Sequence, residues 1–108
     1  MRFIAPFLPQ LIALCERHGV ARLYAFGSSV TDRFDEATSD VDLLVELPIA
    51  DPLQRGETLL TLWEELETLF GRRVDLLTPE SIRNPYLKKS IEQTRILLYD
   101  RQRQEIPV

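Results

Sequence analysis

The sequence of 108 residues contains little of the chemistry that cysteine and histidine provide. It has one cysteine, Cys15, and one histidine, His18. A disulfide framework needs paired cysteines, a zinc site needs several Cys or His ligands, and a serine or cysteine triad needs a histidine beside its nucleophile. These counts exclude a disulfide scaffold and a Cys/His zinc site, and they argue against a nucleophilic triad within this chain.

Positive charge and long apolar runs are also scarce. The chain has 13 Lys and Arg residues against 17 Asp and Glu residues, a net charge of −4. We therefore expect no direct nucleic-acid binding through broad neutralisation of phosphates. No apolar run approaches membrane-spanning length, and the N-terminus lacks the charged-then-apolar layout of a signal peptide. The expectation is a cytoplasmic protein with no membrane association.

Helical periodicity appears in three places. The length predicts one domain over residues 1–108, with a polar and frayed tail at 101–108. Apolar residues at helical spacing predict a first helix from Ile4 to a stop at Gly19, and a second over residues 53–70 with a stop at Gly71. Asn84-Pro85 is a good cap and first-turn pair for a last helix through Ile91.

Strands are expected between these helices, at residues 21–26, 41–47, 73–77 and 96–99. The alternation of helices and strands predicts an α+β fold with α/β-type order. We expect a small mixed sheet with its helices packed on one face.

Aspartates interrupt two of the predicted strands. Because side chains alternate along a strand, Asp40 and Asp42 share one face of the second strand and Asp75 lies opposite the apolar residues of the third. If helices cover only the apolar face and the strands are neighbours, the three carboxylates converge on the open face. The competing interpretation is a pair of solvated acids on an edge strand. Asp75 and the glycine turn at Gly27 favour a functional site.

Clustered carboxylates repel one another unless a counter-charge is present. An oxygen-only site suits Mg²⁺, which usually completes its shell with water and substrate phosphates. Upstream, the Gly27-Ser28 turn lets backbone N–H groups and the Ser28 hydroxyl approach a phosphate, and we group Ser29 with this turn. A phosphate turn next to a carboxylate–metal cluster predicts nucleoside triphosphate chemistry.

Two segments carry a family resemblance. FGSSVTDRFDEATSDVDLLVEL, residues 26–47, resembles the Gly-Ser … Asp-x-Asp signature of the DNA polymerase beta-type nucleotidyltransferase superfamily. VDLLTPESIRNPYLKKSIEQTRILLYD, residues 74–100, resembles the downstream segment of its minimal, single-domain members. Those members are the antitoxin partners of HEPN-domain toxins in bacterial and archaeal toxin–antitoxin pairs. The resemblance covers nearly the whole chain.

The resemblance implies a polymerase beta-like fold that transfers a nucleoside monophosphate from a triphosphate to a hydroxyl. Gly27 and Ser28 match the phosphate-holding turn of the family. Asp40 and Asp42 match the pair that binds both metal ions, here two Mg²⁺. Asp75 matches the third carboxylate, which helps to hold the catalytic metal and assists deprotonation of the incoming hydroxyl.

One stretch departs from the family pattern. Many members carry an Arg soon after Gly-Ser and a Gly further along, whereas this chain has Ser29, Val30, Thr31 and Asp32. Arg33 is the candidate to steady the triphosphate in their place.

The acceptor is expected on another molecule. Polymerase relatives hold a primer with additional basic domains, and small-molecule relatives add a second domain to complete the acceptor pocket. In well-studied minimal members the acceptor is a tyrosine of the HEPN toxin, and adenylylation silences that toxin. The leading hypothesis is therefore a protein adenylyltransferase that uses ATP and forms a hetero-oligomer with a HEPN toxin. The alternatives are an antitoxin that acts by binding alone, and a dimeric nucleotidyltransferase for a small molecule.

Several other residues are expected to be structural. Trp63 is predicted to pack in the core, and Cys15 to be a small buried apolar residue without a catalytic role. His18 is expected to offset a helix dipole. Tyr86 is expected to be a packed ring, and Lys88-Lys89 to be solvated charges.

Overall fold

A computed structural model of the chain describes residues 1–31, 35 and 38–103. Arg33 and residues 104–108 of the predicted tail lie outside the described residues. The elements in chain order are η1 (Ala5–Phe7), α1 (Leu8–His18), β1 (Arg22–Ala25), η2 (Gly27–Val30), β2 (Val41–Glu46), α2 (Pro52–Phe70), β3 (Val74–Leu77), η3 (Pro79–Ser81), α3 (Pro85–Thr94) and β4 (Ile96–Asp100), where η marks a 3-10 helix.

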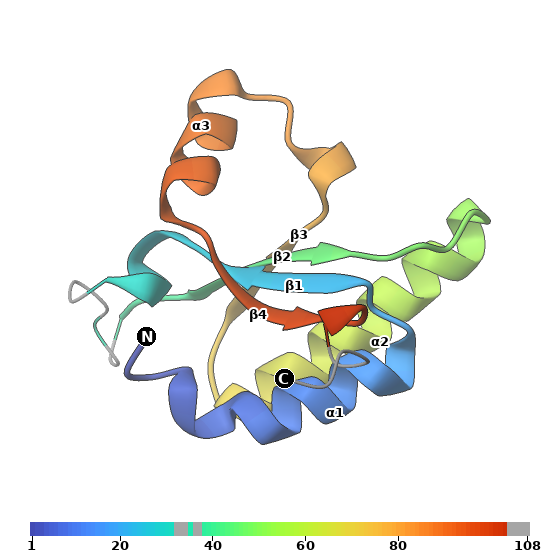
Figure 1. Ribbon diagram of the computed structural model, residues 1–108, viewed down its shortest axis with the longest axis horizontal. Helices are drawn as coiled ribbons and strands as arrows, with labels where there is room; N and C mark the ends of the chain where they lie inside the picture. Colours follow the sequence, from blue (N-terminus) through green and yellow to red (C-terminus); the bar gives the residue numbers. More distant parts are fainter. Residues whose placement is uncertain (32–34, 36–37, 104–108) are drawn as a thin grey trace.

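The four strands form one mixed sheet in the order β3-β2-β1-β4 (Figure 1). β1 pairs antiparallel with both β2 and β4, whereas β2 and β3 run parallel. The parallel pair needs a crossover connection, and α2 provides it. All four predicted strands are confirmed to within one residue at each end.

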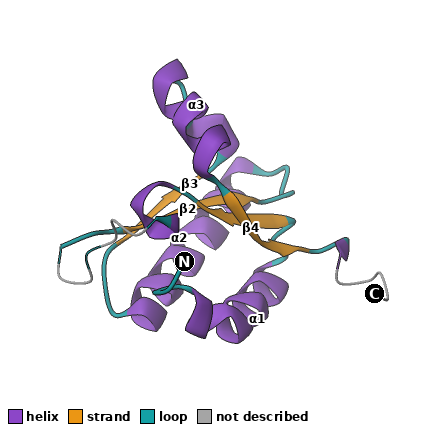
Figure 2. Cartoon of the chain, turned by 60° about the vertical axis from the view of Figure 1, so that its left-hand side comes forward, coloured by secondary structure: helices purple, strands orange, loops and turns teal. Residues whose placement is uncertain are grey.

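The two longer helices, α1 and α2, lie together on one face of the sheet (Figures 1 and 2). They cover the alternate strand residues that point to that face, and the resulting core is closed to solvent. Its members with at most 1% exposure are Ile4, Leu11, Cys15, Val20, Leu23, Ala25, Val41, Leu43, Val45, Leu62 and Leu66. This confirms the prediction that the apolar face of the second strand, with Val41, Leu43 and Val45, is covered by a helical layer.

Glycines and capping side chains determine where the helices begin and end. α1 and α2 stop at Gly19 and Gly71, whose φ angles of 68° and 64° lie in the left-handed region. At the other end of α2, the Asp51 side chain accepts a hydrogen bond from Leu53 N–H. Asn84 caps α3 by accepting from the N–H groups of Tyr86 and Leu87.

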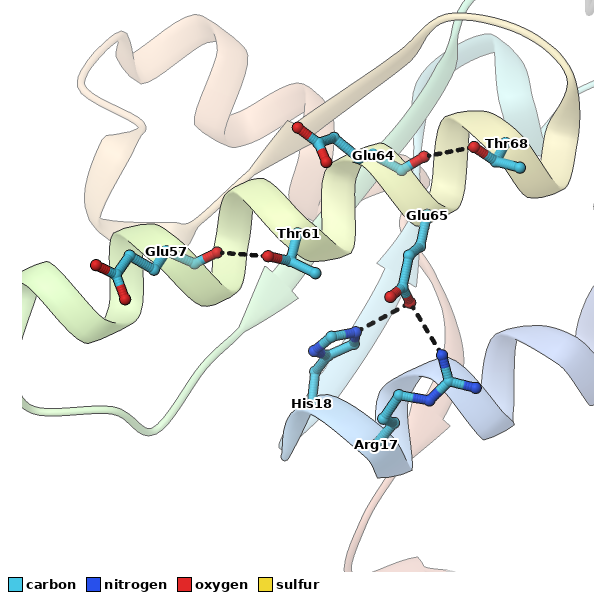
Figure 3. A network of polar contacts seen from close by, with 7 residues as sticks. All are labelled: Arg17, His18, Glu57, Thr61, Glu64, Glu65 and Thr68. Atoms are coloured by element: carbon cyan, nitrogen blue, oxygen red, sulfur yellow. Dashed lines mark hydrogen bonds and ion pairs between the residues drawn. The ribbon is translucent and has the colours of Figure 1, made fainter.

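Polar contacts join α1 to α2 at the surface of the helical layer (Figure 3). One carboxylate oxygen of Glu65 lies 3.0 Å from His18 Nε2 and 3.4 Å from Arg17 Nη1. His18 therefore contacts a carboxylate of the neighbouring helix in addition to lying at the end of α1. Such partly exposed pairs contribute at most about 1 kcal/mol to the stability of the fold.

Cys15 and Trp63 take the structural roles expected of them. Cys15 is buried in the core, and burial together with the nearby Glu16 raises the pKa of its thiol to about 12. The thiol is therefore protonated and unreactive in the folded protein. Trp63 packs against the core and its indole N–H donates to Val74 O at 2.9 Å. The expectation of a packed ring at Tyr86 is wrong, because that side chain is 84% exposed.

The third helix corrects the expectation that all helices pack on one face. α3 lies on the opposite side of the sheet from α1 and α2 (Figure 1). There Ile91 is buried with Phe26 and Leu44 in a second, smaller cluster, because Leu44 points to the same face as Asp42. α3 therefore covers part of the face that carries the aspartates.

Within the described ranges, none of the helices combines the length and apolar character needed to cross a bilayer.

Candidate active site

Two of the three predicted carboxylates occupy matching positions on neighbouring strands. Asp42 of β2 and Asp75 of β3 are register partners in the parallel pair. Partner residues of a parallel pair point to the same face, so both side chains leave the sheet on the side opposite α1 and α2. Asp40 immediately precedes β2, on the same side by alternation, and is partly buried.

The start of β2 is held by its neighbours. Val41 N–H donates to Arg73 O at 3.0 Å, and Arg72 Nη1 donates to Ser39 O at 2.7 Å. These contacts tie the residues on both sides of Asp40 to the end of the α2–β3 connection. The position of the acidic pair therefore depends on the turn that comes after α2.

Gly27 lies directly against the carboxylate of Asp42. It has a φ of +64°, and a Cβ atom built at this position would lie 2.8 Å from Asp42 Oδ2. A side chain here would meet both an unfavourable backbone conformation and a steric clash. The sequence predicted that a glycine lets the backbone come close to a ligand. In this structure the backbone also comes close to an acidic residue of the site.

Both backbone groups of Asp42 form hydrogen bonds to residues of the turn. Asp42 N–H donates to Ser29 Oγ at 2.8 Å, and Phe26 N–H donates to Asp42 O at 3.1 Å. Ser29 is 1% exposed, so its hydroxyl faces the protein interior, where it helps to hold β2 in place. The contact of Ser29 with nucleotide stays a prediction. Gly27 and Ser28 are only partly buried, so both are accessible from solvent.

A residue that the sequence did not single out completes this arrangement. Gly27 N–H donates to Thr94 Oγ1 at 3.2 Å, and the same hydroxyl donates to Ser90 O at 2.9 Å. Thr94 is the last residue of α3, three positions beyond the predicted end of that helix at Ile91. Only the spacing of three between Ile91 and Thr94, which places both on similar sides of the helix, hinted at this role.

The electrostatics of the cluster centre on Asp42. Burial raises the pKa of its carboxyl to about 6, with further contributions from the negative charges of Asp75 and Asp40. All three acids therefore interact through space, as the sequence predicted from alternation. The pKa of the Asp42 carboxyl is brought near neutral pH by surroundings that disfavour its charge.

A divalent cation suits this donor set because every candidate ligand is a carboxylate oxygen and the charges need compensation. Among residues 1–31, 35 and 38–103, however, no group of three or more His, Cys, Asp or Glu side chains is already gathered around one point. Asp42 and Asp75 are in register, and Asp40 lies two residues before Asp42 on the same face. The assignment of these three residues as metal ligands accordingly stays a prediction.

Comparison with known proteins identifies a family for most of the chain. Residues 10–98 match the family model described as the nucleotidyltransferase domain. Among curated proteins, the chain is 39% identical over 85 residues to one from Methanocaldococcus jannaschii named "Putative protein adenylyltransferase MJ1217". That match covers 79% of this chain and 83% of the relative.

Solved structures share the fold. A structure described as a "putative minimal nucleotidyltransferase" has a TM-score of 0.62 and 29% identity, over 86% of this chain and 90% of its own. The MNT antitoxin in complex with the tri-AMPylated HEPN toxin of Shewanella oneidensis has a TM-score of 0.54 at 22% identity, over 91% and 73%. The mixed sheet, the glycine turn against Asp42 and these matches lead to one conclusion. The chain belongs to the nucleotidyltransferase family.

Proposed function

We propose that this chain is a Mg²⁺-dependent protein adenylyltransferase that transfers AMP from ATP to a tyrosine hydroxyl of a HEPN toxin and thereby acts as its antitoxin. The observation that carries the catalytic part is the contact of the Gly27 backbone with the carboxylate of Asp42, which has Asp75 as its register partner. This contact sets a glycine turn, which can approach a phosphate, next to paired acids that can hold metal ions, and this combination suits phosphoryl-group transfer.

The residues have distinct roles in this proposal. Asp40, Asp42 and Asp75 would hold two Mg²⁺ ions through their carboxylate oxygens. When bound, these ions supply charge neutralisation at the α-phosphoryl group and at the departing pyrophosphate. Gly27 and Ser28 would contact the triphosphate.

The acceptor hydroxyl forms a bond to the α-phosphorus of ATP while the bond to pyrophosphate breaks. In the structure Asp75 is exposed, whereas Asp42 is partly buried. We therefore assign the proton of the acceptor hydroxyl to the Asp75 carboxylate, which an acceptor from solution can reach. The products are an adenylylated tyrosine and pyrophosphate, and no covalent intermediate on this chain is needed.

The protein acceptor is supported by two comparisons. Curated relatives of similar length are named as protein adenylyltransferases. A neighbour in fold is an MNT antitoxin solved with an AMPylated HEPN toxin. For this chain we include four further points in the proposal: a HEPN toxin as partner, a tyrosine as acceptor, ATP as substrate and a cytoplasmic location.

The test combines this protein, Mg²⁺, ATP labelled in the adenylate moiety, and the HEPN protein encoded in the neighbouring reading frame. We expect label on a tyrosine of the HEPN protein, located by peptide mass spectrometry. Asp42→Asn should lower the transfer rate by at least about 1,000-fold, because a metal ligand is lost. Asp51→Asn is the matched control, since Asn also caps helices and Asp51 lies at the exposed start of α2.

Other outcomes separate the alternatives. A stable complex without label would replace catalysis with neutralisation by binding alone. Label on a small molecule and none on protein would indicate a different acceptor. Full transfer by Asp42→Asn would refute the metal-carboxylate mechanism.

A further inference from the structure

A cavity of about 180 Å³ lies between β2 and α3, on the same face of the sheet as the aspartates. Its apolar walls come from β2, from the η3 connection and from α3. They are Leu44, Pro79, Ile82 and Ile91. Leu44 and Ile91 are both nearly inaccessible to solvent, so the floor of this cavity is a packed and preformed surface.

Two elements, β2 and α3, contribute residues both to the cavity and to the candidate active site. Along β2, Leu44 comes two residues after Asp42 on the same face, a separation of about 7 Å. Along α3, Thr94 accepts a hydrogen bond from Gly27 N–H, while Ile91 of the preceding turn lines the cavity. The cavity therefore lies within one or two residues of the contacts with the Gly27 turn along each element, close enough for one nucleotide to reach both.

The rim of the cavity is charged, with four side chains of mixed sign: Glu46, Lys88, Glu92 and Arg95. Two of these already have partners. Glu46 is 3.3 Å from Arg22, and the Arg95 guanidinium lies 4.8 Å from the centre of the Tyr24 ring. In the described part of the chain, Lys88 and Glu92 form no ion pair within 4.0 Å, so one donor and one acceptor remain for a ligand.

We infer that this cavity is the subsite for the base and ribose of the nucleotide, an inference that rests on the proposed function. A flat heteroaromatic base matches apolar walls with a few polar groups at the mouth. Lys88 at the rim donates to the ribose or base, and Glu92 accepts from them. A second cavity of about 320 Å³ lies between β3 and α2, on the side of the sheet away from the Asp42 and Asp75 carboxylates, and is therefore a poorer candidate for the base.

The test compares ATP with inorganic tripolyphosphate, which has the phosphates but neither base nor ribose. Each ligand is titrated with Mg²⁺ into the full chain by calorimetry, without an acceptor. Ile82→Trp fills the cavity from a partly exposed, non-helical position. We expect this variant to weaken ATP binding by about tenfold or more and to leave tripolyphosphate binding unchanged.

Lys88 and Lys89 provide a matched pair. They are adjacent, exposed and on the same helix, and only Lys88 lines the cavity. Lys88→Ala should weaken ATP binding by about threefold, and Lys89→Ala should not. This pair decides the question if circular dichroism shows that Ile82→Trp is unfolded.

Five results would overturn the inference. ATP binding that is unchanged in folded Ile82→Trp would remove the subsite, and equal effects of the two lysine substitutions would do the same. A parallel loss of ATP and tripolyphosphate binding would mean that the cavity acts only through the phosphate turn. Normal ATP binding with loss of transfer to the partner protein would assign the cavity to the acceptor. If the wild-type chain binds neither ligand, the proposed function fails first and the subsite falls with it.

Discussion

The two faces of the sheet differ in what they contribute, one to stability and the other to the candidate active site. On the face covered by α1 and α2, residues such as Leu43 and Leu66 are at most 1% exposed and form one continuous core. On the other face the buried cluster is small, and acids lie beside it at Asp42 and Asp75. Stability comes mainly from the first face, which leaves the second free to gather like charges. Substitutions should therefore separate into those that affect folding and those that affect chemistry.

The largest effect on stability is expected on the helical face. Leu66→Ala removes a side chain that is 1% exposed and should lower the free energy of unfolding by about 3 kcal/mol. Leu60→Ala, on the same helix but 55% exposed, should change it by less than about 0.5 kcal/mol. Urea denaturation followed by circular dichroism measures both. Equal losses would show that the helical face does not dominate stability.

The second-largest effect on stability is expected at Gly27, where the backbone lies against the carboxylate of Asp42. Gly27→Ala should destabilise the fold by about 2 kcal/mol, because φ is +64° and the new methyl group meets Asp42 Oδ2. It should also lower ATP binding. Gly56→Ala is the control, since Gly56 is helical with nothing within 4 Å of the added Cβ, and it should stabilise by about 0.5–1 kcal/mol. A neutral Gly27→Ala would mean that the turn can move away from the acid.

Much of this organisation was readable from the sequence, because it depends on short-range rules. Strand alternation correctly placed Asp42 opposite the core, and Gly19 and Gly71 correctly marked the ends of two helices. The pairing of β2 with β3, which the sequence could only assume, sets Asp42 beside Asp75.

The features that the sequence did not predict depend on long-range contacts. α3 was expected with the other helices, yet Ile91 packs on the aspartate face because Leu44 and Phe26 offer an apolar surface there. Thr94 went unnoticed because its partner, Gly27, lies 67 residues away in the chain. The internal role of Ser29 was missed for the same reason, since a serine after a glycine turn suggests exposure.

A smaller effect concerns the charge on the aspartate face. Burial, Asp75 and Asp40 raise the pKa of Asp42 from 3.8 to about 6, so the folded state binds its proton more tightly than the unfolded state does. Stability from this group is present below pH 4 and is lost as the pH rises through about 6. Asp42→Asn, which cannot ionise, should therefore be more stable than wild type by about 1–2 kcal/mol at pH 8.

The measurement is urea denaturation of both proteins from pH 4 to pH 8 with a chelator present. The gain should fade toward pH 4, where the wild-type carboxyl is itself protonated. Asp51→Asn, at the exposed cap of α2, should show no such trend. A stability difference between Asp42→Asn and wild type that stays constant with pH would mean that desolvation and repulsion do not act at this position.

The smallest expected effect tests whether α3 belongs to the chemistry or only to the fold. Thr94→Val keeps the shape of the side chain but leaves Gly27 N–H without its acceptor, at a cost of about 1 kcal/mol in stability. If the turn is then less well held, KM for ATP should rise severalfold while kcat changes little, and Thr94→Ser should restore wild-type values. Thr68→Val is the control, because the Thr68 hydroxyl likewise donates to the carbonyl four residues earlier, Glu64 O (Figure 3), but lies on the helical face. A change in stability without a change in KM would make Thr94 a structural residue, and the aspartate face would then owe its geometry to β2 and the turn alone.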